Sequence, residues 1–134
     1  MKKNLMILLA CFFAIMLFAF ATKTLDQKPW PVPEAAKNKA NPVKADAASI
    51  ANGKTLYTTH CKSCHGSKGK GDGPKASQLD TESGDFTSAA FQAQTDGALF
   101  YKTSEGRKDM PSFKKKIADA NDIWAVVNYV RTFK

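Results

Sequence analysis

Residues 61–65 read Cys-Lys-Ser-Cys-His, and this C-x-x-C-H stretch decides what the rest of the chain is built around. The spacing is the one used to attach a c-type haem, whose porphyrin edge bonds to the two thiols. The imidazole that follows then faces the iron. The stretch therefore predicts one covalently bound haem c, with Cys61 and Cys64 as tethers and His65 as an iron ligand.

Two other kinds of site also begin with a C-x-x-C pair. A structural zinc ion needs four ligands, and outside the stretch the chain offers only Cys11 and His60 as further thiol or imidazole donors. A thioredoxin-like dithiol needs strands and a helix around it, whereas residues 66–74 are rich in glycine, which is typical of a loop. A haem-free thiol-disulfide oxidoreductase stays open as an alternative, which a colourless protein with titratable thiols would support.

The N-terminus has the pattern of an export signal. Two lysines precede an apolar run at 5–18, and Ala19-Phe20-Ala21 is a small-x-small cleavage pattern. Residues 1–21 are therefore expected to be a signal peptide or, because the apolar run is near the lower limit for a bilayer span, an N-terminal membrane anchor. Lipidation of Cys11 is a third option. Each version predicts an exported protein in the periplasm, soluble or anchored to the inner membrane.

Residues 22–45 are rich in Pro, Lys, Ala and Asn and show no helical or strand period, so we expect a linker. Trp30 lies among three prolines that favour an extended conformation. We expect this side chain either to fold back onto the domain or to anchor a partner. Residues 46–134 would then be the haem domain, which is small for an independent core, so a buried porphyrin would supply apolar mass.

Three helices and no sheet are expected in this domain, so the fold class is all-α, with helices packed around one haem. The first helix runs from about residue 47 into the haem motif, with Gly53 and Tyr57 on one face. The second opens with Thr95 as N-cap and stops near Gly106. The third starts at Asp119, ends with Arg131 and Lys134, and buries one apolar stripe. That stripe consists of Ile123, Val126, Val127, Val130 and Phe133.

Met110 is the best candidate for the sixth iron ligand. The other three methionines all lie in the leader. Met110 is flanked by Asp109 and Pro111, in a loop pattern between the second and third expected helices, where a methionine is badly placed to fill a core. A thioether is a known axial ligand of haem iron. His60 is the other nitrogen donor, and we expect it on the surface because it belongs to the attachment helix.

These motifs together resemble the class I c-type cytochromes, small monohaem all-helical proteins. The resemblance covers about residues 48–133. It implies that Gly53 and Tyr57 pack across the last helix, with Tyr129 as their aromatic partner. It also implies that the Pro74 carbonyl accepts a hydrogen bond from His65. Met110 followed by Pro111 is similar to the family's sixth-ligand motif.

Coordination by both His65 and Met110 leaves no open iron position, which predicts a one-electron carrier cycling Fe(III)/Fe(II) in a respiratory electron-transfer chain, and no enzyme activity of its own. The alternative is a haem enzyme or a gas or redox sensor in which Met110 is dissociated. A dedicated subunit of a larger redox complex is also open.

The positive charge of the chain indicates which kind of redox partner it binds. The full chain has a net charge of +8, and six basic residues surround Met110 in sequence: Lys102, Arg107, Lys108, Lys114, Lys115 and Lys116. We expect them to attract redox partner proteins with acidic docking surfaces, such as a quinol-oxidising complex or dehydrogenase and an oxidase or reductase. Nucleic acid is excluded by the exported location. The polar loop at 75–94 is expected to cover the haem edge.

Overall fold

The computed structural model describes residues 29–134. The predictions for the leader at 1–21, and for the first part of the expected linker, lie outside the described residues. The chain divides into two compact units, Met1–Trp30 and Pro31–Lys134. Every helix discussed below belongs to the second unit. Trp30 belongs to the first, so the prediction that it folds back onto the domain stays a prediction.

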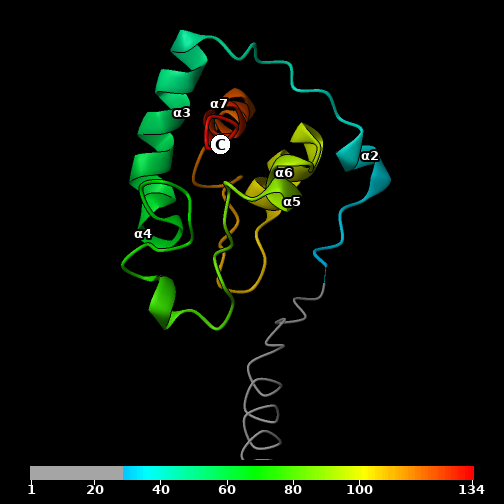
Figure 1. Ribbon diagram of the computed structural model, residues 1–134. Helices are drawn as coiled ribbons and strands as arrows, with labels where there is room; N and C mark the ends of the chain where they lie inside the picture. Colours follow the sequence, from blue (N-terminus) through cyan, green and yellow to red (C-terminus); the bar gives the residue numbers. More distant parts are fainter. Residues whose placement is uncertain (1–28) are drawn as a thin grey trace, which may run out of the picture. The chain divides into compact units, whose positions relative to one another are not determined.

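The second unit is all-α, as predicted. Its longer helices are α3 (Ala47–His60), α6 (Asp96–Glu105) and α7 (Ala120–Val130). Figure 1 shows α3 and α6 on opposite sides with α7 between them. The shorter helices are α2 (Glu34–Lys37), α4 (Lys62–His65), η1 (Ala76–Gln78) and α5 (Ala89–Gln92). Within residues 29–134 there is no β-strand, only an isolated bridge between Arg107 and Met110.

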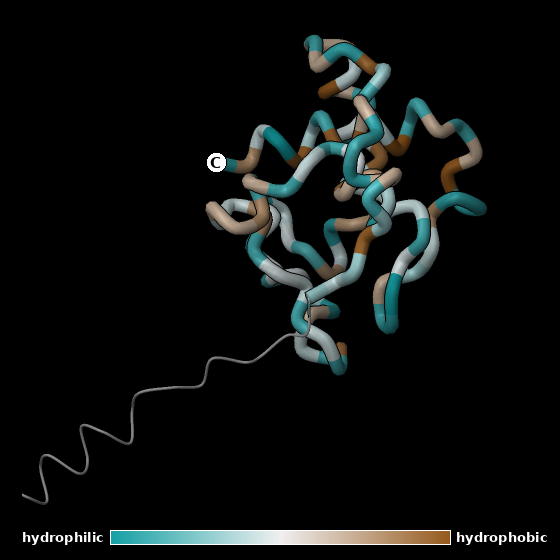
Figure 2. The backbone as a smooth tube through the Cα atoms, turned by 90° about the vertical axis from the view of Figure 1, so that its right-hand side faces the viewer, coloured by the Kyte–Doolittle hydropathy of each residue, from teal (hydrophilic) through white to brown (hydrophobic). Residues whose placement is uncertain are grey.

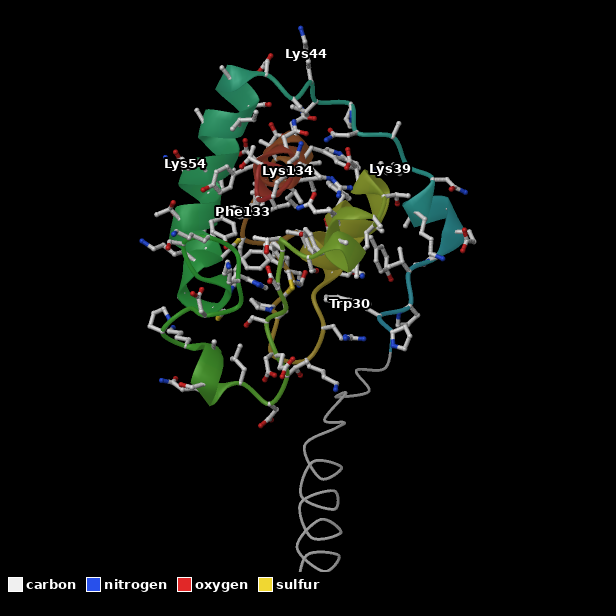
Figure 3. All side chains as sticks on the ribbon, in the orientation of Figure 1. Trp30, Lys39, Lys44, Lys54, Phe133 and Lys134 are labelled. Carbon is white, nitrogen blue, oxygen red and sulfur yellow. The ribbon has the colours of Figure 1, made fainter. Side chains whose placement is uncertain are left out.

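The predicted starts of the second and third helices and the predicted stop of the second are confirmed, whereas the third helix ends at Val130, before the predicted Arg131 and Lys134. The Thr95 side chain caps α6 by accepting a hydrogen bond from the Ala98 N–H, and Asp119 caps α7 by accepting from the Asn121 N–H. Gly106, with φ of 69°, ends α6 in a conformation that glycine adopts at little cost. α7 ends at Val130, so Phe133 of the expected stripe lies beyond the helix and points toward α3 (Figure 3).

The crossing of α3 and α7 is the centre of the fold. Gly53 lies so close to α7 that a Cβ there would overlap the Ala125 carbonyl oxygen, so only glycine fits. One turn later the Tyr57 ring meets Tyr129 edge to face, with centroids 5.3 Å apart. The Tyr57 hydroxyl donates a 2.7 Å hydrogen bond to the Gly66 carbonyl. The expected contact between the first and last helices is therefore present.

Residues 31–45 of the expected linker at 22–45, called the strap here, contact the helices. The strap lies in the same compact unit as the helices. Its Lys37 carbonyl accepts a 2.7 Å hydrogen bond from the Thr95 hydroxyl, and its Ala36 carbonyl lies where a side chain of Gly97 would be. Its Asn41 amide donates to Asn128 Oδ1 at 2.8 Å. Backbone and amide groups make these contacts, which explains why the segment has no apolar period.

The buried apolar residues form two clusters. The larger joins Tyr57 and Cys61 to α6 and α7, and the smaller consists of Phe113, Ile117 and Ile123. Figure 2 shows the hydrophobic stretches as short pieces between hydrophilic ones. Among the described residues, no helix combines the length and the apolar character needed to cross a bilayer.

Candidate functional site

Two adjoining pockets, of about 560 and 580 Å³, lie beside α4, and Cys61, His65 and Met110 line both of them. The first pocket is mainly apolar and is otherwise lined by Tyr57, Phe86, Phe91, Leu99, Lys102, Thr103, Val126, Val127 and Val130. The second has a polar wall and is otherwise lined by His60, Cys64, Leu79, Thr81, Glu82, Ser83, Arg107, Asp109, Pro111 and Phe113. The four predicted site residues therefore meet around one space.

The His65 imidazole is held at the end of α4. Its ring stacks on Phe86, with centroids 4.4 Å apart and an interplanar angle of 29°. Burial lowers the pKa of His65, and the backbone of Ser83 opposes that shift. Within the described residues, His65 Nδ1 is buried and has no hydrogen-bond partner. A neutral, half-buried imidazole that lines both pockets fits a metal ligand.

Cys61 is the N-cap of α4 and Cys64, three positions later, is the third residue of that helix, which puts the two thiols on one face. Cys61 is buried, and burial together with the nearby Cys64 raises its pKa to about 12. Cys61 is therefore protonated at neutral pH, unlike the thiolate of a reactive dithiol. Neither cysteine is in a disulfide. Within the described part of the chain, no group of three or more His, Cys, Asp or Glu residues could hold a metal ion. These features fit thioether attachment of haem better than a zinc site or a dithiol.

Met110 reaches the pockets from the loop that follows α6. A pair of backbone hydrogen bonds closes this loop, from Arg107 N–H to the Met110 carbonyl at 2.8 Å and from Met110 N–H to the Arg107 carbonyl at 3.0 Å. Lys108, between them, has a φ of 51°, a left-handed conformation that is uncommon outside glycine. The turn presents Met110 to the same space as His65, although whether it binds iron stays a prediction.

Two expectations about neighbouring residues differ from the structure. Pro74 makes no hydrogen bond to His65, because Nδ1 has no partner in the region described. Its neighbour Gly73 instead donates its N–H to the Cys64 carbonyl at 3.2 Å. His60 is half-buried, not on the surface, and its ring meets Phe113 edge to face at 6.0 Å.

The sequence did not single out the apolar and polar residues of the 75–94 loop that line the pockets. Phe86, which stacks on both His65 and Phe91, was detectable only as an aromatic residue in a polar stretch.

The basic residues near Met110 in sequence fall into two groups in the structure. Lys102 and Arg107 line the pockets, whereas Lys108 and the lysines at 114–116 are exposed. Burial, and then the charge of Arg107, lower the pKa of Lys102.

Comparisons with solved structures agree with this geometry. The chain is similar to one in the Kuenenia stuttgartiensis reducing HAO-like protein complex Kustc0457/Kustc0458, with 26% identity, a TM-score of 0.64, and coverage of 79% of this chain and 52% of that one. It thus spans about half the length of that relative. It is also similar to the KustC0563 c-type cytochrome, with 33% identity, a TM-score of 0.54, and coverage of 61% and 96%. No curated protein matches.

The model of the family described as cytochrome c matches residues 50–134. This range is more than half of the chain and contains every residue that lines the two pockets. The match, the helical fold and the paired thiols therefore agree, and the chain belongs to the cytochrome c family, whose members carry covalently bound haem c and transfer electrons.

Proposed function

We propose that this protein is a one-electron carrier that holds a single haem c through Cys61 and Cys64, with His65 and Met110 as axial ligands. The observation that carries the proposal is that Met110 and His65, from separate parts of the chain, line the same two pockets. A single pair of cysteines supports one haem per chain.

A c-type haem supplies one-electron Fe(III)/Fe(II) chemistry. The chain's own residues set its character. The soft thioether of Met110 favours the ferrous state over the ferric one. The apolar residues of the first pocket, such as Leu99 and Val127, exclude water and act in the same direction. If His65 and Met110 both hold the iron, no position is left for a substrate, and the chain would act as a carrier.

The test is an optical spectrum of the exported protein, oxidised and reduced, with and without carbon monoxide. Sharp reduced bands that the gas does not change, and a weak sulfur-to-iron band in the oxidised form, are expected for His65 and Met110 ligation. Ready binding of the gas would instead support the alternative of a haem enzyme or sensor with Met110 dissociated.

We place this carrier in the periplasm, as part of a respiratory chain. The lysines before an apolar run and the Ala19-Phe20-Ala21 pattern support export. Mass spectrometry of the mature protein, combined with fractionation of the cells, tests this. A mass that begins at Thr22 indicates a free periplasmic protein, and the full mass in the membrane fraction indicates an anchor. Recovery in the cytoplasm would contradict the location.

Redox partners with acidic surfaces are proposed to dock on the exposed lysines near Met110. Lys114, Lys115 and Lys116 follow directly on the loop that lines the second pocket. Changing all three to Glu should slow electron transfer to an acidic partner and weaken its dependence on salt. The matched control changes three exposed lysines outside the pocket lining, Lys44, Lys54 and Lys134 (Figure 3), to Glu. Equal rates in both variants would contradict a localised docking surface.

A second candidate within this function is a subunit of a larger redox complex. It is favoured by the structural likeness to a chain of a complex that contains an HAO-like protein. Size-exclusion chromatography of the native extract distinguishes the two. Elution of the haem absorbance at the mass of one chain indicates a diffusing carrier, whereas co-elution with a second protein indicates a subunit.

A further inference from the structure

Two hydroxyl groups on the polar wall of the second pocket have no partner. Thr81 Oγ1 and Ser83 Oγ are inaccessible to solvent, and neither makes a hydrogen bond within the described residues. Both residues line the pocket. A buried polar group without a partner is unfavourable, so native proteins rarely leave one. These two hydroxyls therefore fit a hydrogen-bonding partner that the protein chain itself does not supply.

The segment that carries these hydroxyls has an alternating pattern. Leu79, Thr81 and Ser83 are half-buried, whereas Asp80 and Glu82 are exposed. Leu79, Thr81 and Ser83 all line the second pocket, and Glu82 between the two hydroxyl residues lines it as well. The Thr81 N–H donates a 2.9 Å hydrogen bond to Asp109 Oδ2, which ties the segment to the Met110 loop. The two hydroxyls are thus held in place before any ligand arrives.

The charges around this wall favour an anion. Arg107 lines the second pocket and Lys102 lines the first, and the charge of Arg107 contributes to lowering the pKa of Lys102. The two cations are therefore close enough to repel each other, and an anion beside them relieves that repulsion. Two carboxylates also line the second pocket, but Asp109 accepts from Thr81, and Glu82 is exposed.

We propose that Thr81 and Ser83 donate hydrogen bonds to the propionate carboxylates of the haem, with Arg107 as their counter-charge. The inference rests on the covalent haem of the proposed function. The porphyrin ring is apolar, and its propionates are its anionic groups. Attachment to Cys61 and Cys64, which both line the second pocket, would bring the ring to both pockets, and its carboxylates would suit the hydroxyls and guanidinium of the second.

Redox-induced infrared difference spectroscopy tests this on the haem-loaded protein, with the propionate carboxylates labelled by growth on ¹³C-carboxyl 5-aminolevulinate. Hydrogen bonding changes the carboxylate stretching frequency, so the labelled bands should shift in Thr81→Val and in Ser83→Ala. Thr81→Ser, which keeps a hydroxyl, should leave the bands in place. The matched controls are Thr58→Val and Ser77→Ala, which make the same chemical changes at exposed positions that line neither pocket.

Labelled bands that stay in place in haem-loaded Thr81→Val and Ser83→Ala would overturn the inference and leave the proposed function intact. Equal shifts in the two control variants would also overturn it. If Thr81→Val does not fold, Ser83→Ala, which removes a single oxygen atom, still decides the outcome. Absence of covalent haem from the unaltered protein would overturn the proposed function itself, so the two failures are distinguishable.

Discussion

His65 and Met110, the two residues proposed to bind iron, are held in different ways. His65 ends α4, which follows directly on α3, and α3 is locked against α7 at Gly53. Met110 lies in a loop closed by its paired hydrogen bonds with Arg107 and tied to Thr81 through Asp109. Each such bond contributes only about 0.5–1.5 kcal/mol. The Met110 side should therefore open locally, whereas the His65 side opens only when the fold does.

The largest effect is expected on the His65 side, at the thiols. Replacing both Cys61 and Cys64 with Ala removes the covalent tethers, so the purified chain should contain no covalent haem. A haem stain after denaturing electrophoresis measures this. Ser63→Ala, whose hydroxyl lies 3.8 Å from Cys64 Sγ, is the control and should retain the stain. A stained double variant would contradict attachment through this pair.

The next effect concerns the helix crossing that supports His65. A methyl group at Gly53 overlaps the Ala125 carbonyl, so Gly53→Ala should lower the free energy of unfolding by about 3 kcal/mol. Denaturant unfolding followed by circular dichroism measures the loss. Gly84→Ala is the control, because its Cβ meets no atom within 4 Å. Its positive φ of 71° should still cost about 1 kcal/mol. Equal losses of unfolding free energy in Gly53→Ala and Gly84→Ala would show that the crossing of α3 and α7 tolerates a methyl group.

On the Met110 side, the corresponding substitution is Met110→Ala. The covalent haem should remain, the ferrous protein should bind carbon monoxide, and stability should fall by about 2 kcal/mol because Met110 is only half-buried. Spectra under the gas and denaturant unfolding provide both measurements. Leu79→Ala, which alters the same pocket, should not bind the gas. If both variants bind it equally, pocket opening and not ligand loss explains the result.

The smallest effect should come from Asp109→Ala, which removes the acceptor for the Thr81 N–H. A lost hydrogen bond of this kind costs about 1 kcal/mol, and the cost should fall on the Met110 loop alone. The sulfur-to-iron band should therefore disappear at lower denaturant than in the unaltered protein, while the global midpoint barely moves. Asp80→Ala, an exposed carboxylate of the neighbouring loop, is the control. Simultaneous loss of the band and of the fold would contradict local opening.

The sequence by itself determined the features whose chemistry is local. The C-x-x-C-H stretch predicted the haem, Thr95 and Asp119 predicted the starts of α6 and α7, and both starts are as the structure has them. Cap and attachment chemistry depends on residues within a few positions, so a single sequence displays it. The all-α class followed from the same patterns.

Only the tertiary structure decided what fills the space around those features. The strap contacts Gly97 and Asn128 through backbone carbonyls and amides, which leave no pattern in the sequence. Phe86 reaches His65, and Thr81 reaches Asp109, across long loops. Such contacts depend on where the chain returns in space, which follows from the packing of the whole domain and not from the spacing of neighbouring residues.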